Sequence, residues 1–150
     1  MALICAFFAA LASIMVPGVV VSTVTEGVNA PLLAAFKERM PDNPVIYSVA
    51  HDLNGDGMDD LVVIYNIAQD VNRMLVVFAG AGESDVPVFT NALPAPVSNQ
   101  VIQFMDIDER PPMEFIVYGS KGLNTGFAIY RCHGDTVEDL FGDKMHECCN

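Results

Sequence analysis

The chain has few basic residues. Only 7 of its 150 residues are Lys or Arg, against 19 Asp or Glu, so the formal net charge at pH 7 is -12. This balance repels phosphate groups, so we expect neither a nucleic acid nor an anionic membrane surface as a partner. The excess of carboxylates suits divalent cations, although solubility alone also accounts for it. The length allows one domain with a real core.

Charge is absent from the first part of the chain. No charged residue precedes Glu26, and residues 2–21 are mostly apolar. Such a run is typical of a secretion signal or a membrane anchor, although the usual basic start of a signal peptide is missing. We therefore predict a signal peptide or membrane anchor at residues 1–25, with cleavage after Ala12, after Ala30 or not at all. The protein is then extracytoplasmic, whether periplasmic, secreted or membrane-anchored.

The chain also lacks the common catalytic motifs. It contains no G-x-S-x-G elbow, no phosphate-binding loop, no H-E-x-x-H zinc motif and no dinucleotide fingerprint. We interpret His51, beside Asp52, as a surface residue at a strand end rather than as a catalytic base. An enzyme is therefore not expected, and a thiol oxidoreductase is the main enzymatic alternative.

One helix and seven strands are predicted. Residues 29–40 begin with Asn29, a good capping residue, and carry Pro31 in the first turn. Runs rich in Val, Ile, Phe and Tyr, separated by turn formers, then predict strands at 45–51, 61–67, 74–79, 86–90, 101–105, 115–118 and 127–132. We expect a mainly β fold, an open antiparallel sheet with one short N-terminal helix. The β domain spans residues 29–135, and residues 136–150 form a cysteine-bearing tail.

A weak internal repeat relates residues 45–65 to residues 101–118. In each segment a strand leads into an acidic loop and a second strand follows it. At a spacing of 54 residues the polar loop positions align, pairing Asp52 with Asp106, Asn54 with Asp108 and Asp60 with Glu114. We expect two strand-loop-strand units of the same kind, although hairpins with acidic loops also resemble one another by chance.

Residues 52–60 have the pattern D-x-N-x-D-G-x-x-D. Calcium takes about six to eight oxygen ligands, and oxygen side chains at alternate positions can turn toward one ion. Gly57 permits the sharp turn that brings the chain back. Carboxylates packed this closely repel one another without a cation, which favours calcium over an ordinary hairpin turn. The expected Ca²⁺ ligands are the side chains of Asp52, Asn54, Asp56 and Asp60 and the carbonyl of Met58.

The loop is not an EF-hand, because Val63 stands where that motif needs a bidentate Glu. The sequence D-x-N-x-D-G-x-x-D-L-x-V between strands resembles the FG-GAP/VCBS repeats of integrin-type β-propellers. The resemblance covers residues 45–65 closely and 101–118 loosely, and it implies the same five calcium ligands. Arg110 and Pro111 depart from the pattern in the second loop, so we expect no calcium there and the charge of Arg110 in its place. Two units cannot close a propeller, so the sheet is open or a protein partner completes it.

The cysteines allow two interpretations. Cys132 can form a disulfide with Cys148 or Cys149, which leaves one odd thiol in an exported protein. Alternatively, the adjacent thiols of Cys148 and Cys149 capture a thiophilic metal ion or exchange disulfides with a partner. Cys132, His133 and His146 are then candidates for further ligands.

The sequence D-L-F-G-D-K-M-H-E-C-C near the end resembles the Cys-Cys-COOH (seleno)protein family, which is associated with selenocysteine-assisted organometallic metabolism. The pair is also similar to the tail cysteines with which mercuric reductases pass Hg(II) inward. The resemblance implies that Cys148 and Cys149 bind or relay a soft metal, although Asn150 follows the pair. We therefore expect a non-enzymatic, extracytoplasmic calcium-binding module with a vicinal-thiol tail. The alternative is a structural or adhesive calcium-binding module whose tail is held by a disulfide.

Overall fold

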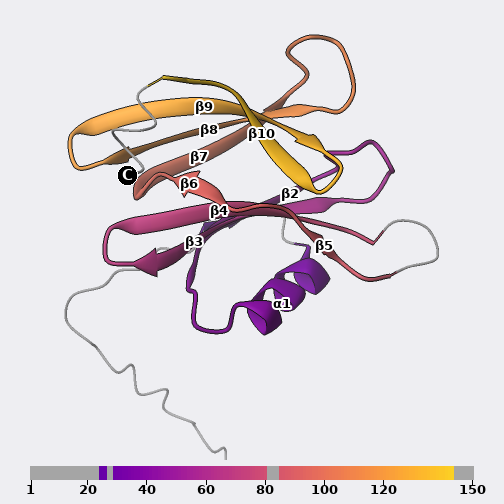
Figure 1. Cartoon of the computed structure of the whole chain (residues 1–150), viewed down its shortest axis with the longest axis horizontal. Coiled ribbons are helices and arrows are strands. Elements are labelled where there is room, and N and C mark those ends of the chain that lie inside the picture. The colour runs from indigo at the N-terminus through magenta and orange to yellow at the C-terminus, as the bar shows by residue number, and fades with distance from the viewer. Residues whose placement is uncertain (1–23, 27–28, 81–84, 144–150) are drawn as a thin grey trace, which may run out of the picture.

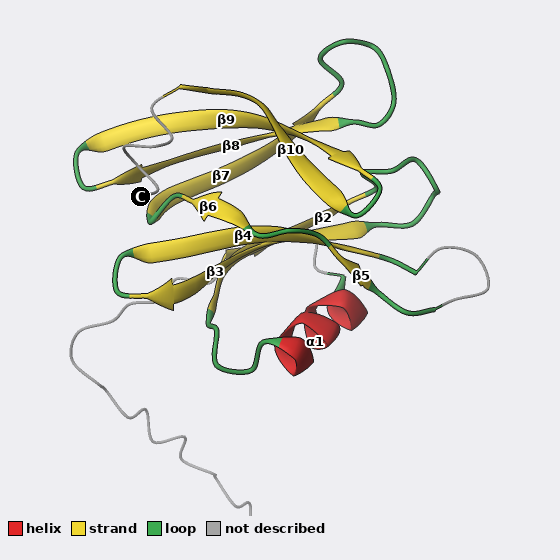
Figure 2. Cartoon of the chain, in the orientation of Figure 1, coloured by secondary structure: helices red, strands yellow, loops and turns green. Residues whose placement is uncertain are grey.

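The computed structural model describes residues 24–26, 29–80 and 85–143. They form two β-sheets stacked face to face, with one helix on the outer side of one sheet (Figure 1, Figure 2). The prediction of a mainly β fold with one N-terminal helix is confirmed, and the two repeat units occupy separate sheets. No helix in the described ranges is long and apolar enough to cross a membrane.

Sheet A contains the first repeat unit. Its strand order is β1-β2-β3-β4-β5, and β6 also pairs with β4. All neighbours are antiparallel except β1 and β2, which are parallel. The strands are β1 (Val24–Glu26), β2 (Val45–His51), β3 (Asp60–Ala68), β4 (Val71–Phe78), β5 (Val88–Phe89) and β6 (Leu93–Ala95). The predicted signal or anchor thus overlaps β1 at residues 24–25, and its residues 1–23 lie outside the described part.

Sheet B contains the second unit in the order β10-β9-β8-β7, antiparallel throughout. Its strands are β7 (Ser98–Met105), β8 (Glu114–Lys121), β9 (Asn124–His133) and β10 (Thr136–Asp143). The predicted domain boundary after residue 135 is therefore wrong. A turn with Gly134 in the left-handed region (φ 59°) returns the chain along β9, and Val137 packs into the core at 3% exposure. Because of this turn and the burial of Val137, sheet B continues to Asp143.

Helix α1 (Ala30–Arg39) begins where the sequence predicts. The side chain of Asn29 accepts a hydrogen bond from the Leu32 amide at 3.4 Å, and Pro31 occupies the first turn. Leu32 and Phe36 are the buried residues of the helix. They pack on the outer face of sheet A in a cluster that includes Leu61, Val63, Tyr65, Leu75 and Val77.

The main core lies between the two sheets. Alternate residues of β3, Val62 and Ile64, face sheet B, while their neighbours in the same strand face α1. Both faces of β3 are therefore covered, as its continuous apolar run predicts. The stacking brings the β2–β3 loop and the β7–β8 loop to the same end of the molecule (Figure 1).

Candidate metal centre

The first loop folds around the carboxylate of Asp52. Its Oδ1 accepts hydrogen bonds from the amides of Gly55 (2.8 Å) and Asp56 (3.2 Å), and its Oδ2 accepts one from Gly57 (2.9 Å). Gly55 and Gly57 have φ values of 76° and 87°, in the left-handed region that favours glycine. The two glycines therefore let the amides of three successive residues, 55–57, point at the carboxylate of Asp52.

Asn54 and Asp56 are the predicted ligands at positions 3 and 5 of the loop, counted from Asp52. The same hydrogen-bond network holds them. The Asp56 amide donates to Asn54 Oδ1 at 2.9 Å, and the Met58 amide donates to Asp56 Oδ1 at 2.8 Å. The Asn54 amide group also donates to Asp56 Oδ2 at 2.9 Å. A carboxylate oxygen that accepts one hydrogen bond keeps a second lone pair, so both Asp56 oxygens retain capacity for a metal ion.

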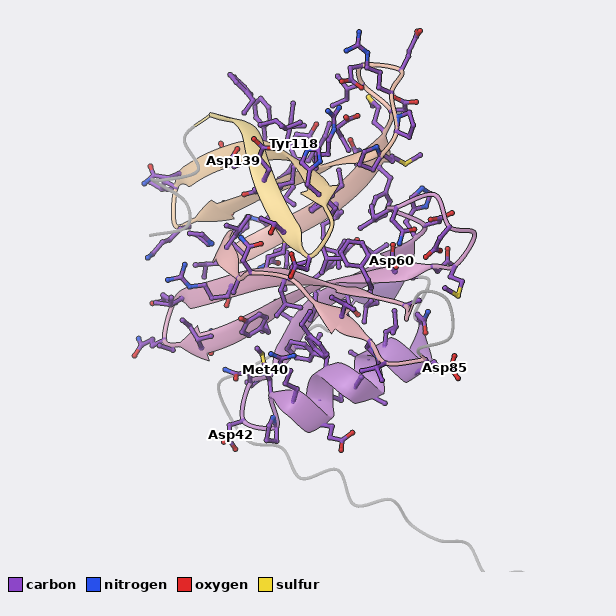
Figure 3. The ribbon with its side chains drawn as sticks, turned by 45° about the vertical axis from the view of Figure 1, so that its right-hand side comes forward. Met40, Asp42, Asp60, Asp85, Tyr118 and Asp139 are labelled. Atoms are coloured by element: carbon purple, nitrogen blue, oxygen red, sulfur yellow. The ribbon has the colours of Figure 1, made fainter. Side chains whose placement is uncertain are left out.

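Asp60, the predicted ligand at position 9, lies at the start of β3 where the loop meets the sheet (Figure 3). It is 0% exposed, and its two oxygens accept hydrogen bonds from the amides of Leu53 and Ala79, each at 3.0 Å. Burial raises the pKa of Asp60 to about 6. The two amides oppose the rise, and the charges of Asp56 and Asp52 add to it. An ionised Asp60 thus carries a free-energy cost that a nearby cation removes.

No side-chain cation offsets these charges within the described ranges. The ion pairs found there join Arg131 to Asp108 and to Glu114, and His133 to Glu138. None of them includes a carboxylate of the first loop. Residues 52–60 therefore concentrate negative charge around a buried carboxylate without a positive side chain paired to it.

The second loop repeats three of the hydrogen bonds of the first. The Ile107 amide donates to Glu114 Oε2 at 2.8 Å. The Arg110 amide donates to Oδ1 of Asp106 at 3.2 Å and to Oδ1 of Asp108 at 3.1 Å. Each of these three bonds lies 54 positions after its counterpart in the first loop. The repeat expected from sequence spacing therefore extends to individual contacts.

The two loops diverge at position 6. At position 4 they share a left-handed backbone, since Gly55 has φ 76° and its counterpart Glu109 has φ 58°. At position 6 Gly57 has φ 87°, whereas its counterpart is Pro111, whose ring holds φ near -65°. The second loop therefore cannot follow the backbone path of the first beyond position 5.

The second loop gathers the acidic group Asp106, Asp108 and Glu114, with ligand atoms within 4.8 Å of one another. The guanidinium of Arg131, on β9, lies among them. Its Nη2 is 2.7 Å from Asp108 Oδ2 and also pairs with Glu114, which is 1% exposed. The hydrogen bond from Arg131 is the main reason that the pKa of Asp108 lies below its usual range. Arg131 thus supplies positive charge where a metal ion would otherwise sit.

The sequence predicts that Arg110 supplies this positive charge. The described hydrogen bonds of Arg110 to the acidic group come from its backbone amide, and its charge adds a smaller lowering of the pKa of Asp108. The guanidinium that pairs with the carboxylates is that of Arg131. The β8–β9 register places Arg131 opposite Glu114. The spacing of residues within the two loops contains no information about that register. A predicted hairpin with a turn at residues 122–123 would have aligned the two residues.

The candidate soft-metal residues divide into two groups. Cys132 is a free thiol in the core between the sheets, 3% exposed, and burial raises its pKa to about 12. His133 is exposed, with Nε2 3.3 Å from Glu138 Oε2. His146, Cys148 and Cys149 lie outside the described residues. The vicinal pair therefore stays a prediction, and Cys132 cannot present its sulfur to solvent without opening the core.

Comparisons of the chain with protein-family models, with curated proteins and with solved structures found no match. The resemblances to FG-GAP/VCBS repeats and to the Cys-Cys-COOH family remain interpretations of short motifs.

Proposed function

We propose that the protein is a calcium-stabilised β-module in which residues 52–60 bind one Ca²⁺ ion. The observation that carries this proposal is the contrast between two loops with the same hydrogen-bonded frame. In the second loop Arg131 pairs with Asp108 and Glu114. No ion pair within the described residues reaches the first loop, and a hard divalent cation supplies the positive charge it lacks.

The proposed ligands are the side chains of Asp52, Asn54, Asp56 and Asp60 and the carbonyl of Met58. Asp60 would connect the ion to sheet A. It is buried at the start of β3 and accepts a hydrogen bond from the amide of Ala79, which directly follows β4. The ion would join the loop to two strands and stabilise the folded state. The role proposed is binding and stabilisation, with no catalytic step.

The proposal extends, on the sequence alone, to Cys148 and Cys149 as a vicinal-thiol pair that binds or relays a soft metal outside the cytoplasm. The burial of Cys132 supports a pair that acts without it. In the alternative, a disulfide from Cys132 to the tail, the second sulfur would have to reach the core between the sheets.

Thermal unfolding in EDTA and in calcium tests the calcium proposal. A ligand that binds only the folded state stabilises it by about 2.7 kcal/mol at 100 times its Kd, so calcium should raise the Tm. Asp56→Ala should lose this gain. Asp59→Ala is the matched control, because this exposed neighbour accepts a described hydrogen bond only through its backbone oxygen. If EDTA leaves the Tm of the unmodified protein unchanged, the proposal is wrong.

A further inference from the structure

A cleft of about 400 Å³ separates the two loops. His51 and Asp52 line it from the first repeat, and Asp106 and Met113 line it from the second. The cleft therefore brings together side chains from both ends of the repeat. Its lining includes one imidazole and one thioether, neither of which has a part in the calcium site.

The imidazole and the thioether are in direct contact. His51 Nε2 lies 3.0 Å from Met113 Sδ, although the residues are 62 positions apart. The His51 ring stacks on Phe104, with centroids 4.4 Å apart and planes at 15°. This stack fixes the ring so that Nε2 is directed at the sulfur. Both side chains are half-buried, so their donor atoms lie at the wall of the cleft rather than in the core.

We propose that His51 and Met113 form a binding site for a soft monovalent cation, Cu(I). Thioether sulfur selects Cu(I) over hard cations, and imidazole is also a good copper ligand. Asp52 and Asp106 lend the cleft negative charge that attracts a cation. Calcium prefers hard oxygen ligands, so the two ions do not compete for the same donors.

The pair must open slightly to hold an ion. Metal bonds to imidazole nitrogen and to sulfur are about 2.0 to 2.3 Å long, so an ion between Nε2 and Sδ requires these atoms to separate by about 1 Å. The His51 ring is held by its stack on Phe104, so we expect the Met113 side chain to move instead. A methionine side chain has three rotatable bonds and adapts readily. Binding should therefore shift the Met113 methyl group.

The test is a competition titration of Cu(I) against a chromophoric chelator, with calcium present. The full chain is used with Cys5, Cys148 and Cys149 replaced by Ser, so that the soft-metal binding proposed for the tail is removed. We expect one Cu(I) per chain. Met113→Leu keeps the side-chain volume, and His51→Phe keeps a ring on Phe104. Each should lower the affinity by more than about tenfold, because even the loss of an outer-shell partner of a metal ligand costs about tenfold or more.

One matched variant serves as the control. Met105→Leu removes an exposed methionine at the end of β7 and should leave Cu(I) affinity unchanged. Redox-inert Ag(I) should shift the methyl resonance of Met113 and leave that of Met105 in place. The proposal is overturned if the chain without Cys5, Cys148 and Cys149 binds no Cu(I), or if Met113→Leu lowers the affinity no more than Met105→Leu does. Calcium binding is expected to persist in all these variants, so either site can fail without the other.

Discussion

Glu114 and Asp60 hold the same place in the two repeats, and within the described residues only Glu114 is paired with a cationic side chain. Each is buried at the first position of its strand, and each accepts a hydrogen bond from the amide seven residues earlier. Glu114 meets the guanidinium of Arg131. The first loop has no such partner, and the proposed calcium ion would give it the charge that Arg131 gives the second.

Arg131→Met should destabilise the protein strongly. It leaves Glu114 as a buried carboxylate without its counter-charge, and breaking a buried pair in this way costs about 3–5 kcal/mol. Urea denaturation measures the loss. Adding Glu114→Gln should recover much of it, because no uncompensated charge then remains.

Arg110→Met is the matched control for that experiment. Arg110 is exposed, and its described bonds to Asp106 and Asp108 come from the backbone, which the substitution keeps. The change should stay within about 0.5 kcal/mol. A loss at Arg110 equal to that at Arg131 would contradict the assignment of the counter-charge.

The calcium-free protein should become more stable as the pH falls from 7 to 5. The pKa of Asp60 is about 6 in the folded state, above its usual 3.8, so the folded state binds a proton more readily than the unfolded chain. The stabilisation is complete below the unfolded pKa and is lost as the pH rises through about 6. The full shift of about two units corresponds to at most about 3 kcal/mol, of which the step from pH 7 to pH 5 contributes at most about 1.4 kcal/mol.

Denaturation in EDTA at the two pH values measures this effect. Asp60→Asn should remove most of the pH dependence between 5 and 7, because Asn does not titrate. Saturating calcium should reverse its direction in the unmodified protein, since bound calcium favours the ionised carboxylate. A stability that falls from pH 7 to pH 5 in EDTA would contradict the environment described for Asp60.

Reactivity toward thiol reagents should distinguish Cys132 from Cys148 and Cys149. Cys132 is buried with a raised pKa, so it should not react with a thiol reagent until the protein unfolds. Replacing Cys148 and Cys149 by Ser, in a chain whose Cys5 is already Ser, should abolish mercury binding by the folded protein and leave the Tm unchanged. If the double variant instead loses about 2–5 kcal/mol, as removal of a native disulfide does, the tail is held by a disulfide.

The sequence predicts most of the elements because their signals are local. Asn29 and Pro31 mark the start of α1, and the strand predicted at residues 45–51 has the bounds of β2. The alignment of Asp52 with Asp106 also holds, since each accepts a hydrogen bond from the backbone amide four residues later. These features depend on neighbours within a few residues.

Features that depend on packing between distant segments could not be predicted in this way. Arg131 reaches the second loop only because of the β8–β9 register. The sequence does not predict β10, because polar residues flank its buried Val137. His51 meets Met113 because the two sheets stack face to face. The spacing of loop residues along the chain contains none of this information.

Calcium titration calorimetry on the ion-free protein tests the central claim most directly. The account predicts one calcium ion per chain, lost in Asp56→Ala and retained when Asp106 and Asp108 are both changed to Asn. This control is needed because Asp106, Asp108 and Glu114 also form a group that could hold a metal ion. Two sites of equal affinity, or one site that survives Asp56→Ala and disappears with the second-loop substitutions, would contradict the account.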